Sequence, residues 1–250
     1  RGEGEHRHAR IHAQQRLAGL RGSDRDVRKL LAKERRTSNR VQDFYVACYL
    51  FWIVVTGAMF FAGMDLLLIV FTLTLGETFL VLAAYCSGSP FAQVGAQREI
   101  YVAMAYEPMI LIMAVAYYLF TGGEDGGSFA VRDIAGFGDM AILPMLGIFL
   151  GFLFILTMKL RKSPFDLSMS HHAHQDIVRG VATEFSGRTY AMMEVSHWYE
   201  NIMLLGMVAL FFQNGGWTGV AIGAVVAVLA YILEIWIDNG FARMKWQTAL

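Results

Sequence analysis

The feature that most constrains this chain is the repetition of long apolar windows that contain no Lys or Arg. There are six such windows, at residues 44–63, 66–86, 101–120, 140–158, 190–212 and 217–237. Each is close to the ~20 residues that a helix needs to cross the hydrocarbon core of a bilayer. With 56% hydrophobic and 17% charged residues among 250, the chain is also too apolar for an ordinary soluble domain. The sequence therefore predicts an all-α fold, a polytopic transmembrane helix bundle with six spans.

Basic residues are distributed unevenly between the two sides of this predicted bundle. If residues 1–43, 87–100, 159–189 and 238–250 share one side, 20 of the 21 Lys and Arg residues lie there, and only Arg132 lies opposite. The positive-inside rule makes the basic side cytoplasmic, so both termini of the chain are predicted to be cytoplasmic. The net charge of zero gives no indication of a nucleic-acid partner.

The polar segments divide the chain into a short leading part and one bundle. Residues 1–40 are predicted to be a basic cytoplasmic segment, in which residues 24–31 have the apolar spacing of an amphipathic helix on the membrane surface. A solvated tail is the alternative interpretation. Residues 41–250 are predicted to be the transmembrane bundle. A turn-forming loop is expected over 87–100, and a long cytoplasmic loop over 159–189 is long enough to be functional.

Several carboxylates lie within predicted spans, where placing a charge in the membrane costs free energy. The acids within or at the edge of the windows are Glu77, Glu107, Glu194, Glu200 and Glu234. A charged carboxylate at mid-bilayer costs ~2.5–3.5 kcal/mol or more, and Asp, Glu and His chains within spans are typical of proton relays. Since the windows hold no Lys or Arg, no cation is expected to pair with these acids. Glu200 and Glu234 are near enough to span ends to meet water instead.

Two local patterns refine the prediction of a relay. Glu107 precedes Pro108, which leaves a backbone carbonyl unpaired and favours local hydration beside the acid. Glu194, His197 and Glu200 recur every three residues on one helix, so that neighbouring members can exchange a proton. An ordinary hydrogen-bonded helix histidine is an equally good interpretation of His197.

Cysteine and histidine spacing predicts no cofactor or metal ion in this chain. Cys48 and Cys86 lie far apart and within apolar windows, so neither a disulfide nor an iron–sulfur cluster is expected. His171, His172 and His174, followed by Asp176, lack a second suitably spaced ligand pair for a metal site. A loop that contacts a partner subunit is the better interpretation.

In its polar motifs and their order, the chain resembles the membrane subunit of Ech-type energy-converting nickel–iron (NiFe) hydrogenases. That family is homologous to the quinone-site membrane subunit of respiratory complex I. The motifs that carry the resemblance are KLRKSPFDL at 159–167, SHHAHQDIVRG at 170–180, TEFSG at 183–187, HWYE at 197–200, and Arg98 with AYE at 105–107. The resemblance covers roughly residues 10–250. Family members usually have eight spans and a Gly-Pro pair in the basic segment, whereas this chain has six windows and lacks that pair.

The resemblance implies partners and residue roles. The expected partners are the hydrogenase large and small subunits, an iron–sulfur subunit, an antiporter-like membrane subunit and the lipid bilayer, in the cytoplasmic membrane of a prokaryote. The NiFe centre and the iron–sulfur clusters would lie in those partners. Together with the intramembrane acids, the family's acids give a predicted proton path of Glu77, Glu107, Asp176, Glu184, Glu194, His197 and Glu200. Docking of the redox module is predicted at Arg98, Arg161, Lys162, Asp166, His171, His172 and His174.

The function expected from this resemblance is ion translocation. The chain would be a non-catalytic subunit that links ferredoxin-dependent hydrogen evolution in its partners to movement of protons or Na⁺ across the membrane. One alternative is the quinone-site subunit of a complex I-like oxidoreductase, which would need a lipid-accessible cavity beside Arg98 and the 159–189 loop. Another is a free-standing secondary transporter, for which inverted repeats would be expected.

Overall fold

The computed structural model describes Ala32 and residues 39–122, 126–160, 180–185 and 187–240. The helices are α2 (Arg40–Phe61), α3 (Leu66–Tyr85), α4 (Pro90–Thr121), α5 (Val131–Gly136), α6 (Leu146–Lys159), the 3₁₀ helix η2 (Gly180–Ala182), α7 (Arg188–Leu210) and α8 (Trp217–Gly240). Over these ranges the structure has no strand, only an isolated bridge between Asp65 and Ala130. The predicted all-α membrane bundle is confirmed.

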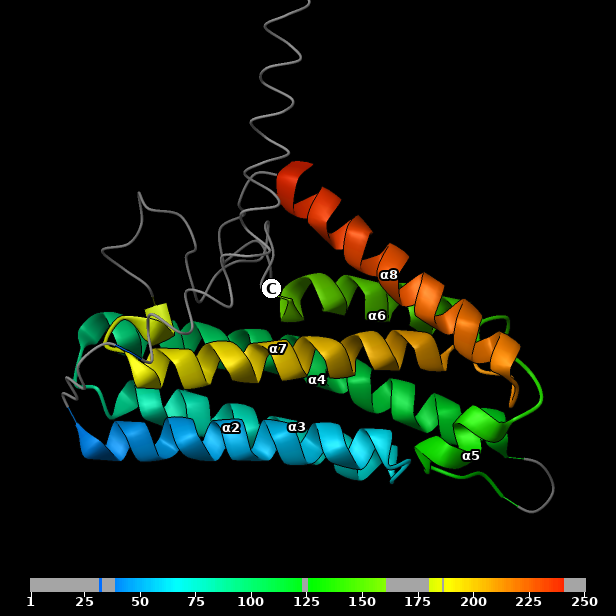
Figure 1. Ribbon diagram of the computed structural model, residues 1–250, viewed down its shortest axis with the longest axis horizontal. Coiled ribbons are helices and arrows are strands. Elements are labelled where there is room, and N and C mark those ends of the chain that lie inside the picture. Colours follow the sequence, from blue (N-terminus) through cyan, green and yellow to red (C-terminus); the bar gives the residue numbers. More distant parts are fainter. Residues whose placement is uncertain (1–31, 33–38, 123–125, 161–179, 186, 241–250) are drawn as a thin grey trace, which may run out of the picture.

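Each of the six apolar windows corresponds to a helix. In the described part of the chain, α2, α3, α4 and α8 are long and apolar enough to cross a membrane. The helix α6, with 14 residues, is shorter. The helix α7 has 23 residues but is more polar, and it lies alongside α2 in Figure 1.

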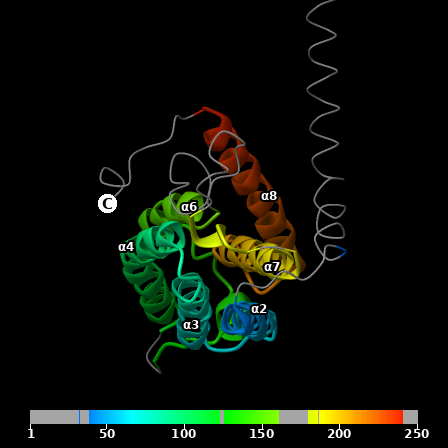
Figure 2. The same ribbon diagram turned by 90° about the vertical axis from the view of Figure 1, so that its left-hand side faces the viewer.

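Five of these helices form a closed ring of packed neighbours. Around the ring, α2 contacts α3, α3 contacts α4, α4 contacts α6, α6 contacts α7 and α7 contacts α2. Figure 2 looks roughly along the helices and shows this arrangement, with α8 outside the ring against α7. Figure 1 shows that α6 ends part-way along its neighbours. The last residue of α6 is therefore placed inside the bundle rather than at one of its ends.

The helix starts follow from capping residues. The side chain of Asn39 accepts a hydrogen bond from the Val41 amide at 3.0 Å, and Asp65 accepts one from the Leu67 amide at 2.9 Å. Pro90 occupies the first turn of α4, where its fixed φ suits a helix and its missing N–H is not needed. The prediction of a loop over 87–100 is therefore wrong beyond Ser89, because the helix already runs through the rest of that segment.

One end of the bundle, here named the α5 end, is tied together by backbone hydrogen bonds between loops. The amides of Leu66, Val131, Ile142 and Gly215 donate to the carbonyls of Phe129, Met64, Phe211 and Ala135, at 2.8, 2.9, 3.0 and 3.0 Å. These bonds join the α2–α3 turn, α5 and the segments that flank α6 and α7. The ends of four ring helices are thereby held in a fixed relation to one another.

Candidate functional site

Every helix of the ring contributes a polar side chain to one connected cluster, here named the central network. Its members are Tyr49 from α2, Glu77 from α3, Tyr106 from α4, Lys159 from α6, and His197 and Glu200 from α7. Buried polar groups in a membrane protein have to satisfy one another, because the hydrocarbon core offers no water. The cluster therefore depends on the ring that encloses it.

Lys159 is the cation that joins the two acidic halves of the central network. Its side-chain nitrogen contacts the carboxylate of Glu77 and lies 3.1 Å from Oε1 of Glu200, and the residue is only 6% exposed. The nitrogen also lies 4.3 Å from the centroid of the Tyr106 ring, within cation–π range. The expectation that no cation pairs with the intramembrane acids is wrong, because α6 ends inside the bundle and its last residue is this lysine.

The two halves have different hydrogen-bond donors. On one side the Tyr106 hydroxyl donates to Oε2 of Glu77. On the other side the Tyr49 hydroxyl donates to Oε2 of Glu200 at 3.3 Å and lies 3.1 Å from Nδ1 of His197. The same His197 nitrogen lies 3.6 Å from Oε2 of Glu200, so the contact predicted from their spacing is present. A chain of contacts thus runs from Tyr106 to His197 through Lys159.

The burial of each acid shows whether it lies inside the bundle, a question that the sequence left open. Glu200 and Glu234 are 3% and 1% exposed, so the alternative that they meet water at span ends is wrong. Glu194 is only half-buried, and within the described ranges it has no hydrogen bond or ion pair. Of the three residues on this face of α7, only His197 and Glu200 join the central network.

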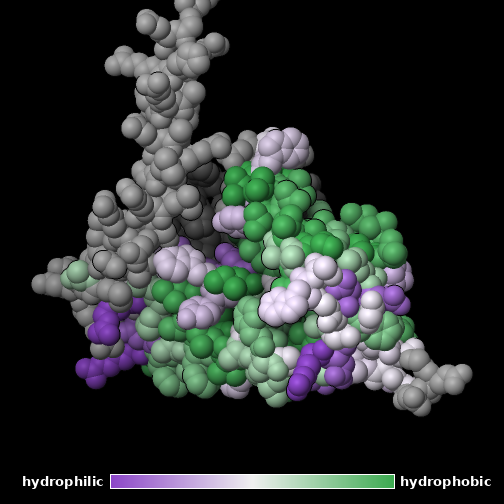
Figure 3. Space-filling view, turned by 45° about the vertical axis from the view of Figure 1, so that its right-hand side comes forward, coloured by the Kyte–Doolittle hydropathy of each residue, from purple (hydrophilic) through white to green (hydrophobic). Residues whose placement is uncertain are grey.

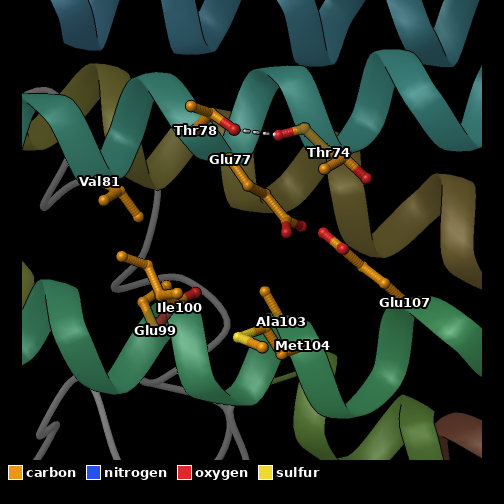
Figure 4. A pocket seen from close by; sticks show the side chains of 9 residues that line it. All are labelled: Thr74, Glu77, Thr78, Val81, Glu99, Ile100, Ala103, Met104 and Glu107. Atoms are coloured by element: carbon orange, nitrogen blue, oxygen red, sulfur yellow. Dashed lines mark hydrogen bonds between the residues drawn. The ribbon is translucent and has the colours of Figure 1, made fainter.

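A groove between α3 and α4 opens beside Glu77, with a cavity volume of about 200 Å³. In Figure 4 the side chains of Glu77 and Glu107 point toward one another across it. Glu99 and the threonines Thr74 and Thr78 line the same groove. The groove therefore places two more carboxylates next to the central network.

Sequence reasoning did not select Tyr49, Tyr106, Lys159 or Glu99 as site residues. Glu99 lies eight residues, or just over two helical turns, before Glu107, so both fall on the same side of α4. Because residues 87–100 were expected to form a loop, this spacing did not indicate a shared helix face. Lys159 directly follows the fourth apolar window, but it was assigned to the following loop. Tyr106 lies in the AYE motif at 105–107, but only the acid of that motif was selected, and Tyr49 had no distinguishing signal among the ten tyrosines of the chain.

The remaining predicted residues are only partly placed. Arg98 is half-buried on α4, and Glu184 is exposed just after η2. Gly95 on α4 holds η2 close, since a Cβ there would lie 2.4 Å from the Val181 nitrogen. The predicted residues that lie outside the described part of the chain are Arg161, Lys162, Asp166, His171, His172, His174 and Asp176. The expected surface helix at 24–31 lies outside it as well.

Chemically, the central network combines groups that accept and donate protons in direct contact. Carboxylate, imidazole, phenol and ammonium groups held at hydrogen-bond distance in a low-dielectric interior can pass a proton from one to the next. Within the described residues, no group of three His, Cys, Asp or Glu side chains is arranged to hold a metal ion.

Residues 8–250 match the protein family described as NADH dehydrogenase. Hydrogenase-4 component C of Escherichia coli (strain K12) is 25% identical over 202 residues, 77% of this chain and 62% of that protein. The NADH-quinone oxidoreductase H subunit of Rubrobacter xylanophilus is 26% identical over 212 residues, 80% of this chain and 63% of that protein. The chain thus spans less than two thirds of the length of these relatives.

A further relative and a solved structure agree with these matches. The NADH-quinone oxidoreductase H subunit of Methylococcus capsulatus is 33% identical over 145 residues, which are 56% of this chain and 42% of that protein. A chain in the structure of the membrane-bound sulfane sulfur reductase, an archaeal respiratory membrane complex, matches with a TM-score of 0.74. That match covers 90% of this chain and 78% of the other at 22% identity, and shows the fold alone.

Proposed function

The chain belongs to the NADH dehydrogenase family, the kinship that its motifs predicted, and from this premise we propose that it is an ion-translocating membrane subunit of a respiratory complex. The complex we infer is a ferredoxin-dependent, hydrogen-evolving nickel–iron hydrogenase. Redox chemistry would take place in the large, small and iron–sulfur subunits, and this chain would move ions toward an antiporter-like membrane subunit. The similarity to hydrogenase-4 component C supports this choice.

The observation that carries the proposal is the central network inside the five-helix ring. Charged groups are costly within a membrane, and a purely structural bundle would do better with apolar side chains at these positions. Instead, Lys159 lies between Glu77 and Glu200, and each carboxylate also accepts a hydrogen bond from a tyrosine hydroxyl. This arrangement suits a relay in which protonation of one group changes the interactions of the next.

The chemistry of the network favours protons over Na⁺ as the ion that it carries. A Na⁺ site needs several oxygen acceptors around one position, whereas the network alternates acceptors with the hydroxyl donors of Tyr49 and Tyr106 and the ammonium of Lys159. Protons are passed between such donors and acceptors. The groove beside Glu77, with Glu99 and Glu107, would supply the network from the α3–α4 side.

A second candidate is the quinone-site subunit of an NADH-quinone oxidoreductase, because two of the relatives carry the name of that enzyme. A quinone site needs an elongated cavity, and small-molecule pockets usually measure ~300–1,000 Å³. The α3–α4 groove, at about 200 Å³, is smaller than that range. The larger cavity of about 590 Å³ lies between α2, α5, α7 and α8, and its lining does not include Arg98. The similarity to hydrogenase-4 component C therefore keeps the hydrogenase assignment as our first choice.

The proposal is tested on the complex that co-purifies with a tagged copy of this chain. We expect nickel and iron in the complex, hydrogen evolution from reduced ferredoxin, and ion uptake into proteoliposomes during that reaction. Collapse of the ion gradient by an ionophore should speed hydrogen evolution. A complex that reduces quinone and evolves no hydrogen would replace the first assignment by the second, and absence of ion uptake in either assay would contradict both.

A further inference from the structure

A second cavity lies at the α5 end, away from the central network. It measures about 590 Å³, within the ~300–1,000 Å³ usual for ligand pockets, and is formed where α2, α5, α7 and α8 approach one another. Its apolar lining includes Phe60 and Phe61 from α2, Leu210 from α7 and Val220 from α8. Figure 3 brings this end of the molecule forward and shows hydrophobic surface beside hydrophilic residues there. Two of the helices that line it, α2 and α8, are long and apolar enough to cross a membrane, so an apolar groove between them suits a lipid acyl chain.

Arg132 stands at this groove with its backbone fixed. Its amide donates to the Gly63 carbonyl at 3.2 Å, and Gly63 at φ +77° lies so close that an added Cβ would be 2.8 Å from Cβ of Arg132. The side chain lines the groove and is exposed, and within the described residues it has no ion pair. Arg132 is also the one basic residue that the charge pattern places on this side of the membrane.

From these two observations we propose that the α5-end groove binds an anionic phospholipid, with its phosphate on Arg132 and one acyl chain between α2, α7 and α8. Apolar packing alone would not select one lipid, because every lipid tail is equally apolar. A guanidinium at the mouth of the groove selects lipids with an anionic headgroup, because it donates paired hydrogen bonds to phosphate oxygens. Basic pockets between membrane helices are known to bind such headgroups. The half-buried amide of Gln213 lines the same groove as a second polar group.

The test measures lipid retention by the detergent-purified protein, with its co-purifying subunits, using native mass spectrometry. The probes are phosphatidylglycerol and phosphatidylcholine with identical acyl chains, so that only the headgroup charge differs. We expect preferential retention of phosphatidylglycerol, and an affinity reduced by about tenfold in Arg132→Gln, since bonds to a charged phosphate are lost. Ala135→Leu, which narrows the groove, should reduce retention as well. Arg40→Gln removes an exposed arginine at the opposite end of α2 and should retain the preference.

Thermal unfolding in detergent without added lipid checks that each variant is folded. Equal retention of the two lipids, or an unchanged preference in Arg132→Gln, would overturn the proposal. Loss of retention in Arg132→Gln but not in Ala135→Leu would indicate attraction to surface charge alone, and would also overturn it. Efficient cross-linking from Ala62→Cys to a partner helix would show that protein fills the groove, and would overturn the proposal as well. None of these outcomes bears on ion translocation.

Discussion

The central network and the α5 end hold the same bundle together by different means. In the central network, side chains from five helices meet, and the contacts are ion pairs and hydrogen bonds among titratable groups. At the α5 end, backbone amides and carbonyls join four loops, and the side chains around them are mostly apolar.

The difference indicates which region can change state. The backbone hydrogen bonds at the α5 end involve no titratable group, so we expect these bonds to be the same in every charge state of the central network. Contacts in the central network depend on which of Glu77, Lys159, His197 and Glu200 carries a proton. If a proton moves along the network, we expect the contacts in the middle of the ring to change while the loops at the α5 end keep their positions, as an ion path in a rigid frame requires.

Removing the cation should have the largest effect on stability. Lys159→Met takes away the ammonium that contacts both Glu77 and Glu200, and breaking a buried ion pair by deleting one partner costs about 3–5 kcal/mol. We expect a large fall in the thermal unfolding midpoint in detergent, together with loss of ion translocation. Arg188→Met, at an exposed position, is the matched control. Equal stability of the two variants would show that Lys159 is not what joins the network.

Removing one hydroxyl should have a smaller effect. Tyr106→Phe leaves the Glu77 carboxylate without a hydrogen bond that it accepts, which costs about 1–3 kcal/mol in a buried site. Translocation should slow while electron transfer to an artificial acceptor continues. Tyr85→Phe, a more exposed tyrosine at the end of α3, should alter neither property. An unaffected translocation rate in Tyr106→Phe would remove that hydroxyl from the relay.

A change at the α5 end should affect stability alone. Gly215 has φ +70°, and an added Cβ would lie 2.8 Å from the Gly136 carbonyl oxygen, so Gly215→Ala should cost about 1–2 kcal/mol. Gly138→Ala is the control, because no atom lies within 4 Å of its added Cβ. Ion translocation per electron should be unchanged in both variants. A fall in that ratio in Gly215→Ala would show that the two regions are coupled.

The smallest stability effect is expected at the groove between α3 and α4. Glu107 is half-buried and lines the groove, so Glu107→Gln should change the unfolding midpoint little. It removes a titratable proton beside Glu77, and ion uptake into proteoliposomes should fall while hydrogenase or dehydrogenase activity persists. Uptake equal to that of Asp139→Asn, an exposed acid, would exclude Glu107 from the supply route.

The apolar windows predicted the helices well, because span length and hydropathy are local properties. They placed Glu77 inside the bundle but left open whether Glu200 meets water, and the three-residue spacing on the same helix correctly predicted the contact of His197 with Glu200. The apolar windows missed the role of Lys159, because the residues next to it in the sequence do not indicate that α6 ends part-way along the bundle. That outcome depends on packing between distant helices, as does the meeting of Tyr49 with His197. The extension of α4 to Pro90 was concealed by turn-forming residues that act only up to Ser89.

The central claim is that the Lys159-bridged network carries ions, and Glu77→Gln tests it most directly. The substitution keeps the size and hydrogen-bonding capacity of the side chain and removes its charge and proton. Ion uptake and electron transfer are measured in the same proteoliposomes, with Asp139→Asn as control. The account predicts that Glu77→Gln assembles and transfers electrons but moves few or no ions per electron. An unchanged ratio of ions to electrons in a fully assembled Glu77→Gln complex would contradict it.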